Sequence, residues 1–170
     1  MEKRKLNTEI VRRIKSDKLS LVIPVLNHLR QSIHSAPYLP EVINLLLETH
    51  NEEIRRELSL FLCDIKDPGG IPHIIDALRN DRYKPIWNII TSACWQSCLN
   101  YSENLETFIK LLLEEDYMTA LEAFSVIEQS LPHLDDRKLD QYRQQLTEGL
   151  DKVTKEKAPL VREMIKIMSD

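Results

Sequence analysis

The chain has 170 residues, of which 42% are hydrophobic and 29% are charged, and its formal net charge at pH 7 is −4. This length fits one domain or one short repeat array, and the apolar fraction argues against a disordered chain. The small acidic net charge argues against a protein that tracks a phosphate backbone, since such proteins usually carry a basic excess. With only 3 glycines, the composition favours helices over sandwiches and barrels, which need glycine in their turns.

Apolar residues at helical spacing predict an all-α chain of about five antiparallel helix pairs. The expected helices cover residues 7–16 and 20–34, 39–48 and 52–65, 71–79 and 83–98, 104–114 and 117–130, and 136–153 and 158–168. The pairs therefore occupy about 7–34, 39–65, 71–98, 104–130 and 136–168, and residues 1–170 are expected to form a single repeat domain. The long, polar first helix of the last pair is typical of a terminal cap.

Self-similarity between the pairs is the strongest signal in the sequence. The first helices share an apolar motif, found as Val42-Ile43-Asn44-Leu45-Leu46, Ile74-Ile75-Asp76-Ala77-Leu78 and Phe108-Ile109-Lys110-Leu111-Leu112. The second helices share an apolar stripe, found as Ile54, Leu58, Phe61 and Leu62 and again as Ile86, Ile90, Ala93 and Cys94. One helix pair cannot bury such a stripe alone, so stacked pairs are expected to form a continuous core.

Turn and cap residues agree with these boundaries. Asp67-Pro68-Gly69-Gly70 is expected to end a helix and to supply glycines for unusual backbone angles, and Pro40 and Pro72 fit the first turn of their helices. Thr49, Asn80 and Asp116 fall in the short links within pairs, where side-chain oxygens can cap helix N–H groups.

Two segments of the middle pairs resemble a known repeat family. Asn51-Glu52-Glu53-Ile54-Arg55-Arg56 is similar to the start of the second helix in HEAT-like repeats of the PBS-lyase type, and Asp67-Pro68 followed by Ile71-Pro72 is similar to the opening of the first helix. In the third and fourth pairs Trp87 and Leu121 stand where the family has arginine. The resemblance implies an α-α superhelix, or solenoid, and commonly a scaffold or adaptor role, without any particular activity.

The faces opposite the apolar stripes predict a surface for a partner. The expected ridge contains Arg56, Asn88, Thr91, Trp95, Glu122 and Ser125. Trp95 is its central residue, because an exposed tryptophan is a common binding anchor. The alternative is that Trp95 folds over onto a neighbouring helix or onto Tyr101, and Trp87 is expected to pack in the core.

The expected function is a non-enzymatic interaction or scaffold module that binds a peptide or helix of another protein. Nucleic acid is not expected as a partner, although a helical-repeat enzyme or nucleic-acid binder, such as a bilin lyase or a DNA glycosylase-like protein, is the alternative. Residues 1–18 are rich in Lys and Arg and residues 101–136 in Asp and Glu, so head-to-tail self-association is possible.

No cofactor, metal or catalytic site is expected. Cys63, Cys94 and Cys98 form no paired framework and lack the ligand spacing of zinc sites. The start of the chain has no apolar targeting segment, and no apolar stretch approaches the roughly 18 residues that a membrane span needs. A cytoplasmic protein without membrane association fits best.

Overall fold

The computed structural model describes residues 6–32, 34–97 and 99–169. These residues form ten α-helices and six short 3-10 helices, with no strand among them, which confirms the predicted all-α class. The chain divides into two compact units, unit 1 (Met1–Leu99) and unit 2 (Asn100–Asp170), and each is described by itself. The single domain and the solenoid over the whole chain stay predictions.

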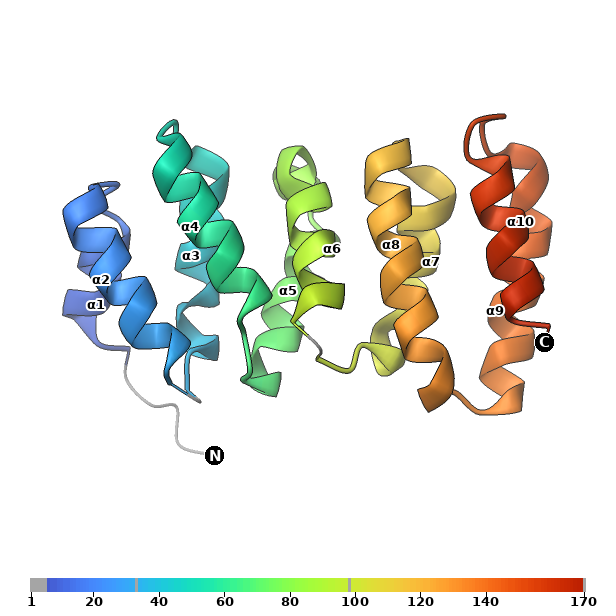
Figure 1. The fold of residues 1–170 in the computed structure, drawn as a ribbon, viewed down its shortest axis with the longest axis horizontal. Helices are drawn as coiled ribbons and strands as arrows, with labels where there is room; N and C mark the ends of the chain where they lie inside the picture. Colours follow the sequence, from blue (N-terminus) through green and yellow to red (C-terminus); the bar gives the residue numbers. More distant parts are fainter. Residues whose placement is uncertain (1–5, 33, 98, 170) are drawn as a thin grey trace. The chain divides into compact units, whose positions relative to one another are not determined.

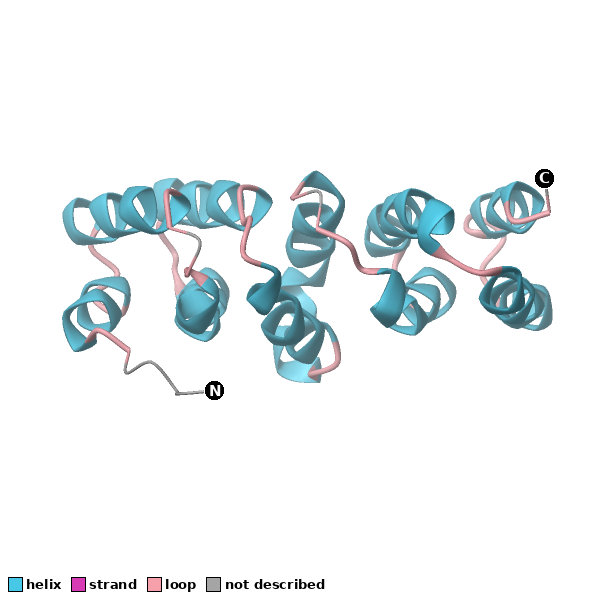
Figure 2. Ribbon diagram, turned by 90° about the horizontal axis from the view of Figure 1, so that it is seen from below, coloured by secondary structure: helices cyan, strands magenta, loops and turns pink. Residues whose placement is uncertain are grey.

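Unit 1 contains three helix pairs arranged in two layers (Figures 1 and 2). The first helices α1, α3 and α5 follow one another in one layer, and the second helices α2, α4 and α6 lie side by side in the other. The elements are α1 (Thr8–Ile14), α2 (Leu19–Arg30), η1 (Ala36–Tyr38), α3 (Leu39–Glu48), α4 (Glu52–Cys63), η2 (Pro68–Gly70), α5 (Ile71–Leu78), η3 (Asp81–Ile86) and α6 (Trp87–Gln96).

Unit 2 contains two further helix pairs, with α7 against α9 in one layer and α8 against α10 in the other. The two layers are joined by contacts of α7 with α8 and of α9 with α10. The elements are η4 (Ser102–Asn104), α7 (Leu105–Glu114), α8 (Tyr117–Ser130), η5 (Leu131–His133), α9 (Asp136–Gly149), η6 (Leu150–Lys152) and α10 (Ala158–Ile167).

The core of each unit lies between its layers and contains the predicted apolar stripes. In unit 1, Ile54, Leu58, Ile86 and Ile90 are at most 1% exposed. Trp87 is also buried, as predicted, and its Nε1 donates to the carbonyl oxygen of Ala77 at 2.9 Å. Burial of these side chains provides the main stabilisation of a stack of amphipathic helices.

Three helices depart from their predicted bounds by four residues at one end. Pro85 accounts for one case, because its ring and missing N–H disfavour the interior of an α-helix: residues 81–86 form η3, and α6 begins only at Trp87. The α9 helix ends at Gly149, where the chain tightens into η6. The α2 helix ends at Arg30 rather than at residue 34.

Glycine in the turn after α4 has a different role from the one predicted. No described glycine has a positive φ, so the expectation that Gly69 and Gly70 supply unusual backbone angles is wrong. A Cβ at Gly70 would lie 2.6 Å from Cδ1 of Leu39, which is fully buried. Gly70 therefore permits close packing of η2 against α3.

In the part of the chain that the structure describes, the one non-glycine residue with a positive φ is Asp17, at 49°. Its Oδ1 accepts a hydrogen bond from Oγ1 of buried Thr49 at 2.6 Å, which joins the first link to the second pair. Thr49 Oγ1 also accepts from the N–H of Asn51 at 3.2 Å, while Asn51 is the N-cap of α4. The prediction that Thr49 caps the helix is therefore wrong, because the cap belongs to the residue directly before α4.

The other two predicted caps are confirmed. Asn80 accepts from the N–H of Arg82 at the start of η3. Asp116 is the N-cap of α8, where Oδ1 accepts from the N–H of Thr119 at 3.1 Å and Oδ2 from its Oγ1 at 2.8 Å.

Replacing Asp116 with Ala is expected to lower the free energy of unfolding by about 1 kcal/mol at neutral pH. Partial burial raises the pKa of Asp116, but hydrogen bonds from Thr119 and nearby backbone N–H groups outweigh it, and the pKa lies below 3.8. The stabilisation is therefore present above pH 3.8 and is lost as the pH falls through the lowered folded pKa. Asp116→Asn, an N-cap that does not titrate, is the control in urea unfolding across this range. A difference between wild type and Asp116→Asn that did not shrink at low pH would contradict the argument.

None of the helices in the described ranges is both long enough and apolar enough to cross a membrane.

Candidate binding surface

The exposed side of α4 contains the first predicted site residue. Arg56 is exposed, and its side chain is 67% accessible to solvent. One turn later Leu60 is 47% exposed, although it is a large apolar residue, and Cys63 follows half-buried. At about 100° per residue, Arg56, Leu60 and Cys63 form one stripe opposite Ile54 and Leu58. The predicted ridge does not include Leu60, although an apolar residue on the polar side of its helix is a signal for a binding surface.

The same stripe continues on α6, which lies beside α4. Asn88 is exposed, and Ser92 and Trp95 are half-buried. These residues occupy the positions that correspond to Arg56, Leu60 and Cys63 one pair earlier. We call the set Arg56, Leu60, Cys63, Asn88, Ser92 and Trp95 the α4–α6 surface.

Thr91 does not belong to this surface, and its prediction as a site residue is wrong. Its side chain is 0% exposed. Thr91 lies four residues after Trp87 and three before Cys94, both of which are buried, so all three share one side of the helix. The buried arc of α6 is wider than that of α4 because Trp87, rather than a polar residue, lies at its edge.

Thr91→Val is expected to raise the free energy of unfolding by about 1 kcal/mol. Among the described residues Thr91 Oγ1 is buried without a hydrogen-bond partner. Valine has nearly the same shape, with a methyl group in place of the hydroxyl. Thr119→Val is the matched control, because Thr119 is also buried but donates to Asp116 at 2.8 Å. Urea unfolding should show the two variants changing stability in opposite directions, and a loss with Thr91→Val would contradict the prediction.

The remaining predicted site residues lie on α8 of unit 2. Glu122 and Ser125 are both half-buried, and Ser125 Oγ donates to the carbonyl oxygen of Leu121 at 3.5 Å. The exposed large apolar side chains of this helix are Met118 at 54% and Tyr117 and Leu121 at 37% each. Val126, the residue after Ser125, is 2% exposed. The buried residues of α8 therefore occupy different repeat positions from those of α4, and Glu122 lies at the edge of the open face of α8.

The charges beside the α4–α6 surface are largely compensated. Arg30 of α2 donates from Nη2 to the carbonyl oxygen and Oε2 of Glu57, both at 3.2 Å. Its Nε lies 3.3 Å from Oδ2 of Asp64. Both Arg30 and Glu57 are partly buried, with side-chain exposures of 22% and 16%. This network joins α2 to α4 and occupies the guanidinium.

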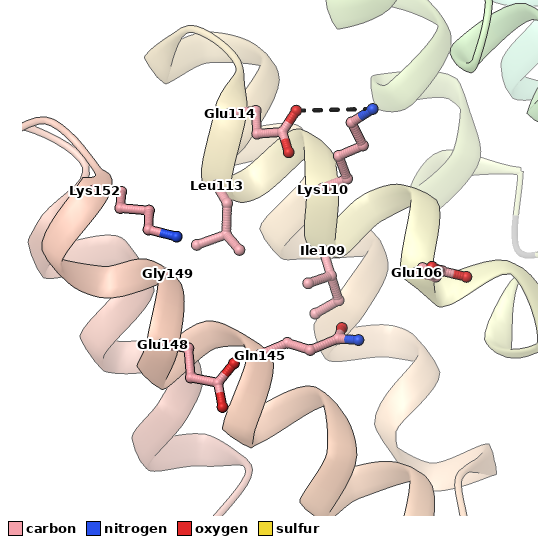
Figure 3. Close-up of a pocket in the computed structure, with 9 residues that line it drawn as sticks. All are labelled: Glu106, Ile109, Lys110, Leu113, Glu114, Gln145, Glu148, Gly149 and Lys152. Carbon is pink, nitrogen blue, oxygen red and sulfur yellow. Dashed lines mark ion pairs between the residues drawn. The ribbon is translucent and has the colours of Figure 1, made fainter.

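A pocket in unit 2 was not predicted (Figure 3). It has a volume of about 580 Å³ and is lined by Glu106, Ile109, Lys110, Leu113 and Glu114 of α7 and by Gln145, Glu148, Gly149 and Lys152 of α9 and η6. Its floor forms where Leu113 lies against Gly149: a Cβ at Gly149 would come within 2.8 Å of both Leu113 methyl carbons. Ile109 and Lys110 belong to the first-helix motif, but the repeat pattern does not identify the pocket, because it does not predict which residues of α9 lie opposite them.

Among the described residues, no three His, Cys, Asp or Glu side chains are placed to hold a metal ion. Cys94 is buried and its Sγ donates to the carbonyl oxygen of Ile90 at 3.2 Å, while Cys63 is half-buried. Cys98, the third predicted thiol, lies outside the described residues.

Comparison of the chain with protein-family models, with curated proteins and with solved structures found no match. The HEAT-like resemblance therefore rests on the sequence motifs alone and stays a prediction.

Proposed function

We propose that the chain is a HEAT-like, non-enzymatic interaction module whose α4–α6 surface binds a helix or peptide of another protein. One observation carries the proposal: a large apolar side chain, Leu60, stands 47% exposed on the polar side of α4. The neighbouring helix adds half-buried Trp95, and Arg56 stands one turn away on α4. Tryptophan and arginine are the residue types most enriched in interaction hot spots.

The chemistry of this surface favours an amphipathic segment as the partner. Leu60 and Trp95 offer apolar contact area, and Asn88 and Ser92 on α6 offer hydrogen-bonding groups. The exposed Arg56 guanidinium, 3.4 Å from Glu57, can pair with an acidic residue at the edge of the contact. Such a polar rim gives register and specificity, while the apolar centre supplies most of the affinity.

The nucleic-acid alternative receives less support from this part of unit 1. A phosphate-binding surface needs several available cations, but Arg30 beside α4 is already engaged by Glu57 and Asp64. As part of the same proposal, the protein acts in the cytoplasm, in keeping with cysteines that form no paired framework in the sequence.

Trp95→Ala is expected to weaken binding of the partner at least tenfold, a loss of about 1.4 kcal/mol. The test is affinity capture from native lysate with wild type, Trp95→Ala and Asn88→Ala, followed by titration of the protein that wild type retains. Met118→Ala on α8 is the control for loss of an exposed side chain elsewhere, and circular dichroism checks that each variant is folded. Equal retention by all variants, or recovery of nucleic acid instead of a protein, would contradict the proposal.

A further inference from the structure

The open side of α8 in unit 2 is apolar over two turns. Met118 is 54% exposed, and Tyr117 and Leu121 are 37% exposed each. Half-buried Phe124 lies three residues after Leu121, so it continues the same side of the helix. We call Tyr117, Met118, Leu121 and Phe124 the α8 patch. The exposed residues of α10, which contacts α8 (Figure 1), are Pro159 and the charged Arg162, Glu163 and Lys166. A helix with an apolar open side normally packs against a further surface.

The charges beside the α8 patch are acidic. From residue 111 to residue 136 the sequence contains no lysine or arginine. Glu115 and Asp116 stand directly before α8, and Glu122 lies within the helix beside the patch. The ammonium of Lys157 offsets part of this charge, since it donates to the carbonyl oxygen of Glu115 at 2.6 Å, but it is buried. The patch therefore favours a partner surface without carboxylates and with donors or cations at its edge.

Unit 1 contains a small pocket of this kind, where α1 begins and α2 runs into η1. Its volume is about 190 Å³. Buried Leu29 and half-buried Ile10 line it, and Leu6, which is 42% exposed, adds to its apolar lining. The phenol oxygen of Tyr38 accepts from the N–H of Asn7 at 3.2 Å, which holds the start of α1 beside η1. A cavity of about 150 Å³ can enclose benzene, so this pocket has room for one large apolar side chain.

The polar groups at this pocket are complementary to an acidic neighbour. Among the described residues that line it none is acidic, and the exposed side chains of His28 and His34 provide N–H donors. On α1, Arg12 and Arg13 both place their Nε 2.8 Å from the carboxylate of Glu9. Two guanidiniums against one carboxylate leave this helix with a net positive charge.

We propose that the α8 patch of one copy of the chain docks onto this pocket of a second copy. Met118 enters the pocket beside Leu6 and Leu29, and the carboxylates of Asp116 and Glu122 face the imidazoles and α1. Each chain carries one patch and one pocket, so the contact joins two different surfaces and association runs head to tail. Opposite charges at the edge select this pairing over patch with patch.

Sedimentation velocity at low ionic strength, over a range of protein concentrations, tests the proposal with Met118→Asp in the patch and Leu6→Asp at the pocket. Both residues are exposed, so the variants are expected to fold, which circular dichroism checks. Wild type is expected to form concentration-dependent oligomers that dissociate as salt is raised. Each variant should associate about tenfold or more weakly. An equimolar mixture of the two variants is expected to form dimers, because each supplies the surface that the other lacks.

Leu60→Asp on α4 is the control, because it leaves the patch and the pocket unchanged and should associate as wild type does. The proposal is overturned by wild type that stays monomeric, by a patch or pocket variant that associates as wild type does, or by a mixture of the two variants that stays monomeric. The α4–α6 surface shares no residue with this contact, so substitutions in the α8 patch leave capture through Leu60 intact. Monomeric wild type that still retains a partner through Leu60 would overturn this inference alone.

Discussion

Replacing Phe108 with Ala is expected to lower the free energy of unfolding by about 3–5 kcal/mol. Phe108 is 0% exposed at the centre of unit 2, and its ring meets that of buried Tyr101 edge to face, with centroids 5.5 Å apart and planes at 73°. Truncation removes buried apolar area, this aromatic contact and the packing of the surrounding helices at once. The expected loss is large because the α7 backbone cannot move in to fill the cavity that the missing ring leaves.

Urea unfolding followed by far-UV circular dichroism measures this loss. Phe124→Ala on α8 is the matched control, because Phe124 is only half-buried and its truncation should cost clearly less. Equal losses in the free energy of unfolding for the two variants would mean that Phe108 does not lie at the centre of the core of unit 2.

Lys157→Met is expected to lower the free energy of unfolding by about 2–3 kcal/mol. Lys157 is 4% exposed, and its Nζ donates to the carbonyl oxygens of Leu113 at 2.8 Å and Glu115 at 2.6 Å, with Leu112 at 3.4 Å. These are carbonyls at the C-terminal end of α7, which have no partner within the helix. Methionine keeps the aliphatic stem but leaves these acceptors without their charged donor.

The charge of Lys157 is part of this argument. Burial lowers its pKa, and the carboxylates of Glu115, Asp116 and Glu114 act to raise it. Carbonyl oxygens only accept, so all three bonds together need the three N–H groups of the protonated amine. Thermal and urea unfolding of Lys157→Met beside Lys155→Met, whose lysine is exposed, checks the prediction. Equal stability of the two variants would contradict it.

Local patterns in the sequence predicted the helices well. Apolar spacing located all ten, and α3 has the predicted bounds of 39–48 and α8 those of 117–130. Asn80 and Asp116 cap as expected, because an N-cap depends on a side chain only two or three residues from its partner. Pro40 and Pro72 likewise lie in the first turns of α3 and α5.

The errors in the candidate site concern contacts between helices. Thr91 is buried since Trp87 widens the buried arc of α6, and the open side of α8 is turned because Ala123 and Val126 both face the core of unit 2. The Lys157 bonds and the α7–α9 pocket join residues far apart in sequence. Helical periodicity predicts the buried side of a helix only to within about one residue. It does not predict which residues of other helices contact that side.

The most direct test of the proposed function is affinity capture with Leu60→Asp and Leu121→Asp run beside wild type. Both substitutions put a carboxylate on an exposed leucine of a second helix, at 47% and 37% exposure, but only Leu60 belongs to the α4–α6 surface. Wild type and Leu121→Asp are predicted to retain the same protein, and Leu60→Asp to lose it while remaining folded. Retention by all three, or loss with Leu121→Asp alone, would contradict a binding site on α4 and α6.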